Sequence, residues 1–245
     1  MPTALVTGAS SGIGWATAIE FARNGFDVVV VARRKELLSK LLEGMPKGNH
    51  RAEVCDVSQW SQVEALSSRV SNLNVLVNNA GAFEYASLEK SVPEKLEEMI
   101  NVNLRGVIYM CKAFLPQLKA SAQAGQSSKI VNISSIGGLW GFSNMAVYTA
   151  TKFAVTGFSS ALRRELAKQK IDVASIHPGP VRNREVESKT PKKAMTMLPD
   201  QVARQIFDLA RSKNRRRISH PLFSMLNLLE NLSPATVDKV LKKIL

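Results

Sequence analysis

The sequence predicts an α/β fold: a doubly wound parallel sheet of about seven strands, with helices on both faces and a short helical tail at the C-terminus. Apolar runs alternate with amphipathic stretches along the chain, which is the order of a parallel sheet with crossover helices. The runs are continuous and rich in branched aliphatic residues, as at 26–32 and 127–135, which indicates strands covered on both faces. Neither a repeat nor a linker is visible, so a single domain over residues 1–245 is expected.

Each element has a local reason. Strands are expected at the apolar runs 3–7, 26–32, 50–57, 73–79, 127–135 and 170–180. Helices are expected where apolar residues recur every three or four positions, at 12–25, 34–44, 61–70, 93–120 and 146–169. Gly25 and Gly44 suit helix ends, and Pro93 suits a helix start. Residues 183–198 indicate a loop, and 221–245 predict two short helices.

Composition limits the class of protein. Hydrophobic residues make up 45% and charged residues 22%, as in soluble globular proteins. No run approaches the roughly 18 apolar residues of a membrane span. The chain enters its first strand at once, which leaves no room for a targeting peptide. Cys55 and Cys111 are expected to be buried free thiols, so we expect a cytoplasmic protein, and no metal site is expected.

The formal net charge of +13 is the one unusual value, and it suits nucleic acid, an acidic membrane or anionic substrates. Arg215–Arg217 is the only tight basic cluster and has no interleaved aromatic residues, so nucleic-acid binding is not expected. In the tail, Leu222, Met225, Leu226, Leu229 and Leu232 form one apolar stripe. The tail therefore either rests on an acidic membrane or packs over its own domain, and we favour the second reading.

The turn between the first strand and the first helix predicts a dinucleotide site. Glycines at 8, 12 and 14 permit a tight turn, close approach of a ligand to the backbone, and close packing of helix on strand. Free N–H groups at the helix start favour a pyrophosphate. The expected contacts come from Thr7, Gly8, Ser10, Ser11, Gly12, Ile13 and Gly14.

The end of the second strand predicts which dinucleotide binds. NAD sites of this kind place an acid there for the ribose 2′-hydroxyl, but this chain has Arg33 and Arg34. Arg33 suits a 2′-phosphate, so NADP(H) is favoured over NAD(H); the alternative is that both arginines are ordinary surface residues, as Arg34 is taken to be. Asp56, followed by Val57, either accepts from the adenine amino group or caps the next helix, where Ser58 competes.

A candidate acid/base pair lies at Tyr148 and Lys152. They stand four residues apart in a helical pattern, so their side chains share one face. A fixed ammonium favours the phenolate and lowers the pKa of a nearby phenol, which makes it a usable acid or base. Ser135 ends a predicted strand and can reach over to hold a carbonyl oxygen. Alone, the pair is more typical of a solvated surface helix than of a catalytic site.

The whole set of motifs resembles the short-chain dehydrogenase/reductase family, whose fold is Rossmann-like. The resemblance runs from residue 7 to about 183 and depends on order as well as on residue type. The matching residues are Thr7-Gly8-x-x-x-Gly12-x-Gly14, Asn78-Asn79-Ala80-Gly81, Asn103, Ser135, Tyr148-x-x-x-Lys152 and Pro178-Gly179.

The resemblance implies hydride transfer between a nicotinamide and a carbonyl or alcohol, with a role for each matching residue. Tyr148 would be the acid/base, while Lys152 would lower its pKa and bind the ribose. Ser135 would hold the substrate oxygen, and Asn103 would hold a water that links Lys152 to solvent; without the family, Asn103 suits a helix kink. Further cofactor contacts are implied for Asn79, Ala80, Gly81, Pro178, Gly179 and Val181, and Asn183 stands where the family usually has threonine.

The substrate is less well defined by the sequence than the cofactor. An apolar ketone, aldehyde or secondary alcohol is expected, and residues 183–198 are expected to form a lid over it. Core packing or a helical dimer face suits the candidate pocket residues nearly as well: Phe83, Tyr85, Leu139, Trp140, Phe142 and Met195. The family implies a homodimer, with a tetramer as the alternative. A second hypothesis is a catalytically silent protein that senses the dinucleotide, but such proteins lose the tyrosine or the lysine.

Overall fold

The computed structural model describes residues 1–182, 196–230, 233, 236–237 and 240. The first half contains β1 (Thr3–Thr7), α1 (Gly12–Arg23), β2 (Asp27–Ala32), α2 (Lys35–Glu43), β3 (Arg51–Val54), α3 (Trp60–Arg69) and β4 (Val75–Asn78). Then follow α4 (Pro93–Ile100), the π-helix η1 (Asn101–Arg105), α5 (Gly106–Gln123), β5 (Lys129–Ile133), the 3₁₀ turn η2 (Ile136–Gly138) and α6 (Ala146–Leu166). The chain continues through the 3₁₀ turn η3 (Ala167–Gln169), β6 (Asp172–His177), α7 (Pro199–Arg211), β7 (Arg216–Ile218) and α8 (Pro221–Glu230).

The described strands form one parallel sheet of seven, in the order β3-β2-β1-β4-β5-β6-β7. Strands β1 to β3 therefore follow one another from the centre of the sheet to one edge. Strands β4 to β7 follow one another from the centre to the other edge. In such a sheet, ligands bind at the carboxyl ends of the strands where the order reverses, which here is between β1 and β4. The expected single-domain, Rossmann-like α/β fold is confirmed.

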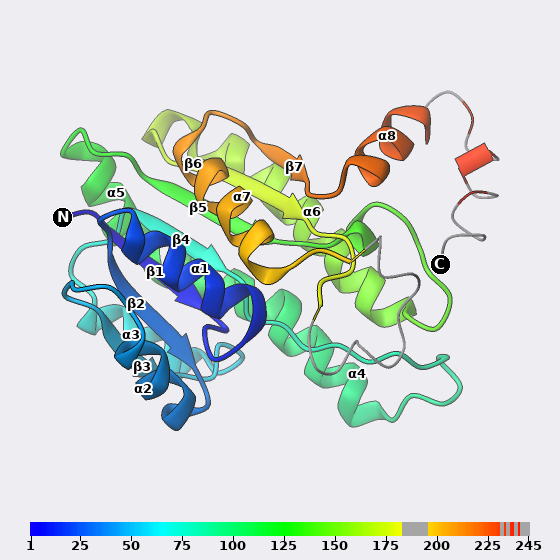
Figure 1. Ribbon diagram of the computed structural model, residues 1–245, viewed down its shortest axis with the longest axis horizontal. Helices are drawn as coiled ribbons and strands as arrows, with labels where there is room; N and C mark the ends of the chain where they lie inside the picture. The colour runs from blue at the N-terminus through cyan, green and yellow to red at the C-terminus, as the bar shows by residue number, and fades with distance from the viewer. Residues whose placement is uncertain (183–195, 231–232, 234–235, 238–239, 241–245) are drawn as a thin grey trace.

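Helices cover both faces of the sheet. On one face α1 and α7 lie side by side (Figure 1), and their buried residues share a core with α2. On the other face α3, α5 and α6 contribute to the second core. Alternate strand residues enter the two layers: Ala4 and Val6 of β1 belong to the first, and Leu5 belongs to the second. Burial on both faces explains why the strands are apolar without interruption.

The structure differs from the sequence-based expectation in three elements. The helix expected at 93–120 is a continuous helical path, but residues 101–105 form a π-helix within it. Helix α7 was not specified from the sequence. The basic cluster Arg215–Arg217 lies largely in β7, an edge strand that pairs with β6. The buried Lys129 side chain fixes the turn before β7, because its Nζ donates to the carbonyl oxygen of Ser212 at 2.6 Å.

The described part of the tail packs over its own domain. Phe223 and Leu226 of α8 are buried together with Ile136 and Trp140, which follow β5. In Figure 1, α8 lies beyond the end of β7, away from the helices that cover the sheet. Most of the second expected tail helix falls outside the described residues. No described helix is long and apolar enough to cross a bilayer.

Candidate active site

The glycine turn has the backbone shape that a pyrophosphate site requires. Gly8 and Gly12 have φ angles of +66° and +55°, a region that side-chain-bearing residues rarely adopt. A Cβ on Gly14 would collide with the carbonyl oxygen of Gly8, whereas a Cβ on Gly12 would meet nothing within 4 Å. The helix and strand are therefore packed tightly at Gly14, while the backbone at Gly12 is open to a ligand. These residues fit a dinucleotide whose phosphates face the start of α1.

Hydrogen bonds join this turn to the Asn78–Gly81 segment that follows β4. The Thr7 hydroxyl oxygen accepts from the backbone N–H groups of Asn79 at 2.9 Å and Ala80 at 3.0 Å. In return, the Asn79 side-chain amide donates to the carbonyl oxygen of Thr7 at 2.9 Å. The carboxyl ends of β1 and β4 are thus locked together at the point where the strand order reverses.

The two arginines after β2 lie differently from the expectation. Arg34 reaches back over the glycine turn and donates to the Ser10 hydroxyl at 2.8 Å and the Ser11 hydroxyl at 3.3 Å. Arg33, the residue expected to bind a 2′-phosphate, has a 62% exposed side chain that lies 3.5 Å from Glu98. Arg34, expected to be an ordinary surface residue, is therefore the arginine that contacts the glycine turn.

Asp56 and Val57 occupy the next turn along this edge. The Asp56 carboxylate accepts from the backbone N–H of Ser58 at 2.9 Å and from its hydroxyl at 2.7 Å, so it organises the turn before α3. An adenine contact by Asp56 stays a prediction. The Val57 side chain is buried, and a Cβ on Gly106 would lie 2.7 Å from it, so this side chain packs against the start of α5. A nucleotide contact by Val57 also stays a prediction.

Tyr148 and Lys152 lie one turn apart near the start of α6, and the Lys152 Nζ is 5.7 Å from the centre of the Tyr148 ring. Lys152 is only 5% exposed, and its Nζ donates to the carbonyl oxygen of Ile133 at 3.0 Å. An ammonium carries three protons, and this is the one hydrogen bond it makes to the described residues. The remaining donors suit ribose hydroxyls on the side that faces Gly81, where a Cβ would lie 4.0 Å from the Nζ.

Burial dominates the electrostatics of this pair. Desolvation raises the pKa of the Tyr148 phenol, while its hydrogen bond to the Ser135 side chain acts in the opposite direction. Desolvation also lowers the pKa of Lys152 to about 8. The expected net lowering of the Tyr148 pKa is therefore absent, because loss of water around the phenolate outweighs its favourable contacts.

Asn103 is the buried centre of the π-helix. Its side-chain oxygen accepts from the backbone N–H of Ala82 at 2.7 Å, and its amide donates to the Ala82 carbonyl at 2.9 Å and to the Thr151 hydroxyl at 3.1 Å. The side chain thus ties the segment after β4 to α6, next to Lys152. A water held by Asn103 stays a prediction.

Ser135 is held by a histidine that the sequence analysis did not select. The Nδ1 of His177, at the carboxyl end of β6, lies 3.0 Å from the Ser135 carbonyl oxygen, and its Nε2 lies 3.2 Å from the Ser175 hydroxyl. Burial lowers the pKa of His177 to about 4, so the ring is neutral near pH 7 and can donate at one nitrogen and accept at the other. Its position directly before Pro178-Gly179 was the available signal.

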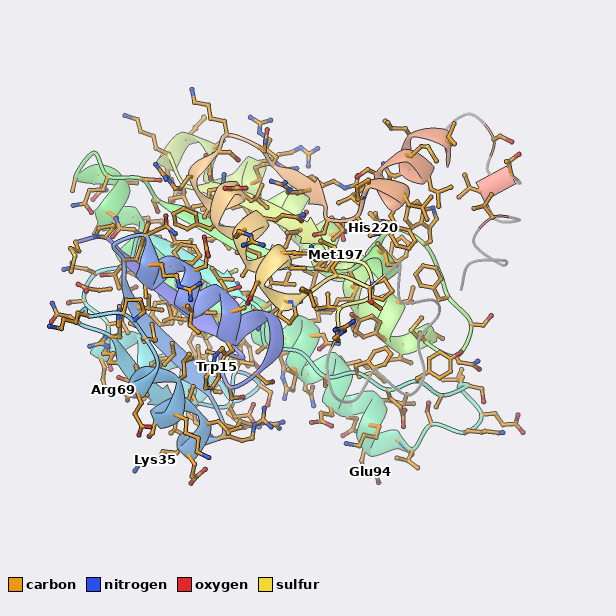
Figure 2. All side chains as sticks on the ribbon, viewed as in Figure 1. Trp15, Lys35, Arg69, Glu94, Met197 and His220 are labelled. Carbon is orange, nitrogen blue, oxygen red and sulfur yellow. The ribbon has the colours of Figure 1, made fainter. Side chains whose placement is uncertain are left out.

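The Pro178–Val181 segment, expected on the nicotinamide side, is held from both ends. The Pro178 carbonyl accepts from the backbone N–H of Ile136 at 2.9 Å, and Val181 pairs with Met197 in an isolated bridge. Figure 2 labels Met197 and His220 on neighbouring segments close to the ends of β6 and β7. Asn183 and Met195 lie outside the described residues.

The remaining pocket candidates separate into two groups. Phe83 is 51% exposed and meets the Tyr148 ring edge to face at 4.9 Å, so it stands at the candidate site. Tyr85 is also exposed, and its hydroxyl lies 3.4 Å from the Asn144 amide. Trp140 is buried against Phe223 of α8, and Leu139 and Phe142 pack on the same cluster. For those three, the geometry favours the packing role over an open pocket wall.

Comparison with known proteins agrees with this geometry. The family model described as short chain dehydrogenase matches residues 2–194. A 3-ketodihydrosphingosine reductase from Bacteroides thetaiotaomicron is 37% identical over 180 residues, covering 71% of this chain and 62% of its own. The human 3-oxoacyl-[acyl-carrier-protein] reductase is 37% identical over 178 residues, covering 71% and 73%.

Solved structures are similar over most of the chain. A serine dehydrogenase complexed with NADP⁺ superimposes with a TM-score of 0.78 at 26% identity, covering 88% of this chain and 93% of its own. A 3-ketoacyl-(acyl-carrier-protein) reductase from Brucella melitensis, complexed with NADH, has a TM-score of 0.79 at 29% identity, covering 89% and 95%. With its glycine turn, Ser135, Tyr148 and Lys152 gathered at one sheet edge, the chain belongs to the short-chain dehydrogenase family of oxidoreductases acting on CH–OH and C=O groups.

Proposed function

We propose that the protein is an NADP(H)-dependent oxidoreductase that interconverts an apolar ketone or aldehyde and the corresponding alcohol. The observation that carries the proposal is the buried Lys152 ammonium, which lies one helical turn from Tyr148 and beside the segment after β4. A buried cation with one protein acceptor is costly, and residues of this kind gather at functional sites. The two reductase relatives, whose names specify 3-keto and 3-oxoacyl compounds, support a carbonyl substrate.

When bound, the nicotinamide supplies or accepts the hydride at the substrate carbon. Ser135 donates a hydrogen bond to the substrate oxygen, and Tyr148 donates its proton to that oxygen in reduction. In oxidation the Tyr148 phenolate accepts the proton from the alcohol. The Tyr148 phenol is protonated near pH 7, because a phenol ordinarily titrates near pH 10 and burial raises the pKa of this one. His177 holds the backbone of Ser135, so the serine meets the substrate from a fixed position.

The cofactor preference rests on the two arginines after β2. A 2′-phosphate near Ser10 and Ser11 would meet the Arg34 guanidinium, and the exposed Arg33 is free to turn from Glu98 toward the same group. No carboxylate ends β2 to bind a ribose 2′-hydroxyl or to repel the phosphate. NADP(H) therefore suits this edge better than NAD(H).

Two copies of the chain suit the outer face of α4, α5 and α6. Ile100 is 45% exposed, Ile108 is 37% exposed, and Phe153 on the neighbouring α6 is 45% exposed. Large apolar side chains gathered on adjacent helices favour association. The partner at this face is therefore a second copy of this protein. The substrate, as proposed above, is a small carbonyl or alcohol compound.

Replacing the acid/base should separate turnover from cofactor binding. We expect Tyr148→Phe to lower kcat by at least the roughly 10²–10⁴-fold that general acid catalysis contributes. The Kd for NADPH, measured by fluorescence titration, should stay the same. Tyr109→Phe is the matched control: Tyr109 of α5 packs against Trp60 of α3, and this variant should keep full activity. Retained turnover in the Tyr148 variant would assign the proton to another group.

The arginine variants test cofactor choice. Arg34→Ala should weaken NADPH roughly 10- to 100-fold, the loss expected for a charge-assisted hydrogen bond, and should change NADH binding far less. Arg33→Ala should show the same selectivity with a smaller loss, because Glu98 competes for that side chain. Equal losses of NADPH and NADH in both variants would place 2′-phosphate recognition elsewhere.

The lowered pKa of Lys152 predicts a pH-dependent stability difference. Between about pH 8 and its ordinary pKa of 10.5, the unfolded chain binds more protons at this site than the folded one, so the free energy of unfolding rises with pH. Lys152→Met removes the cost of burying the charge. The variant should exceed the wild type by about 1–3 kcal/mol near pH 7 in urea unfolding, and the gap should close toward about pH 10.

Comparing variant with wild type cancels the contribution of Lys129, whose pKa burial also lowers. The exposed Lys119→Met serves as the surface control. A Lys152 gap that stays constant with pH would mean that the ammonium is not destabilised by burial.

Association is tested with a charge on the exposed helix face. Phe153→Glu should convert a dimer into a monomer in analytical ultracentrifugation, because an unpaired carboxylate at the centre of an apolar interface is strongly unfavourable. Leu228→Glu places the same charge at an exposed position on α8 and should leave the mass unchanged. A monomeric wild type, or a dimer that survives Phe153→Glu, would contradict this interface.

A further inference from the structure

Helix α8 has two apolar faces, and the domain covers one of them. On the inner face, Phe223 and Leu226 are buried against Ile136 and Trp140. Val237, from beyond the helix, is buried in the same inner cluster. The contacts that hold α8 in place therefore use its inner face, and the outer face is left to be explained.

The outer face of α8 is a stripe of exposed apolar side chains. Met225, Leu228 and Leu229 are 52%, 72% and 40% exposed, and their spacing of three and four places them on one side of the helix. The sequence of α8 has a single charged residue, Glu230, at its last position. A helix that is apolar on all sides is normally covered on all sides. The outer face therefore suits a partner that is itself apolar.

A cluster of arginines adjoins this helix at the β7 edge of the sheet. Arg163 donates to the Arg215 carbonyl oxygen at 3.4 Å, and burial followed by the charges of Arg215 and Arg164 lowers the pKa of Arg163. Arg216 donates to the Asn227 side-chain oxygen of α8 at 3.1 Å, and β7 leads directly into α8 in Figure 1.

The charges of this arginine cluster are not neutralised by the protein. Among the described residues, none of the four guanidinium groups pairs with a carboxylate. Gathered like charges of this kind attract an anionic partner.

Protection of an edge strand does not account for the whole surface. Among the described strands β7 pairs only with β6, and charged side chains on such an edge hinder pairing with other sheets. That explains Arg216, but it does not explain the arginines of α6 or the apolar stripe on α8. Apolar side chains next to cations are typical of a helix at a lipid surface, where the first enter the acyl boundary and the second meet the phosphates.

A second copy of the chain fits this surface poorly. In a symmetric dimer the same patch meets itself, so the two arginine clusters would be brought toward each other. The formal net charge of +13 on each copy adds to that repulsion. An anionic bilayer instead brings an apolar layer and the opposite charge together.

We propose that the outer face of α8 and the arginines at the β7 edge dock the protein on an anionic lipid surface. Met225, Leu228 and Leu229 enter the boundary of the acyl chains, and the arginines bind lipid phosphates through forked, charge-assisted hydrogen bonds. The inner face stays packed on the domain, so docking needs no unfolding of the tail. The two readings of the tail then apply to different faces of one helix.

Co-sedimentation of the full chain with vesicles tests the docking. One set of vesicles is pure phosphatidylcholine, and the other is an equal mixture of phosphatidylcholine and phosphatidylglycerol. A basic residue near an anionic surface strengthens partitioning roughly 5-fold, so the wild type should partition at least about 10-fold more strongly onto the mixed vesicles. Added salt should reduce this preference, because it screens the charges.

The apolar stripe is tested by Leu228→Glu. Partitioning onto mixed vesicles should fall roughly 10- to 100-fold, because the variant loses the burial of a leucine and places a carboxylate beside anionic lipid. The position is 72% exposed, so the variant should unfold at the wild-type temperature. Leu88→Glu makes the same change at a 62% exposed position between β4 and α4 and should keep the wild-type partitioning.

The arginine cluster is tested by the double variant Arg164→Gln with Arg215→Gln. Partitioning onto mixed vesicles should fall roughly 10- to 30-fold, while the weak partitioning onto pure phosphatidylcholine should stay the same. Lys40→Gln with Lys47→Gln removes the same charge from exposed positions on and after α2, and its effect should be far smaller.

A wild type that does not sediment with mixed vesicles would overturn the proposal, as would wild-type partitioning by Leu228→Glu or equal partitioning onto the two compositions. Analytical ultracentrifugation without lipid separates the other occupant: a mass that falls in Leu228→Glu would assign the outer face to a second copy and contradict lipid docking. None of these measurements uses cofactor or substrate, so they leave the proposed oxidoreductase activity to its own tests.

Discussion

The Thr7 hydroxyl is the contact on which the rest of the site depends. It accepts two backbone N–H groups from the segment after β4, and Asn79 returns a bond to the Thr7 carbonyl. Because β1 and β4 are the strands at which the sheet order reverses, these bonds fix the width of the opening between their carboxyl ends. The glycine turn, the Asn78–Gly81 segment and, through Ala82, Asn103 all take their positions from this junction.

Next to this junction, burial shifts the pKa values of Tyr148 and Lys152. Lys152 sits between the carbonyl of Ile133 and the segment after β4, where little water reaches it. Burial weakens the charged form of both members of the pair: it raises the pKa of the phenol and lowers that of the amine. The two proton affinities therefore move apart: the Tyr148 phenol holds its proton more tightly than in water, and the Lys152 amine holds its proton less tightly.

Much of this site could be read from the sequence, because it depends on local spacing. The role of the glycines at 8, 12 and 14 depends on one tight turn between a strand and a helix. The pairing of Tyr148 with Lys152 depends on one turn of a helix. Continuous apolar strands likewise predicted the doubly wound sheet. These features depend on neighbours in the chain, so no tertiary contact had to be known.

The features that were missed depend on distant partners. Whether Arg33 or Arg34 reaches the glycine turn is decided by side-chain direction at the start of α2, which adjacent positions do not reveal. From the sequence, Trp140 suits the wall of a pocket, but in the folded chain Phe223 of α8 packs against it. β7 is three residues long and carries two arginines, so only its pairing with β6 identifies it as a strand.

The packing of α8 brings the C-terminal part of the described chain against two segments of the candidate active site. Phe223 supports both Trp140, five residues after Ser135, and Gly179, where a Cβ would lie 3.1 Å from its ring. The family model stops at residue 194, before this supporting helix begins. A change in α8 would therefore alter the packing behind Trp140 and Gly179 without replacing Ser135, Tyr148 or Lys152.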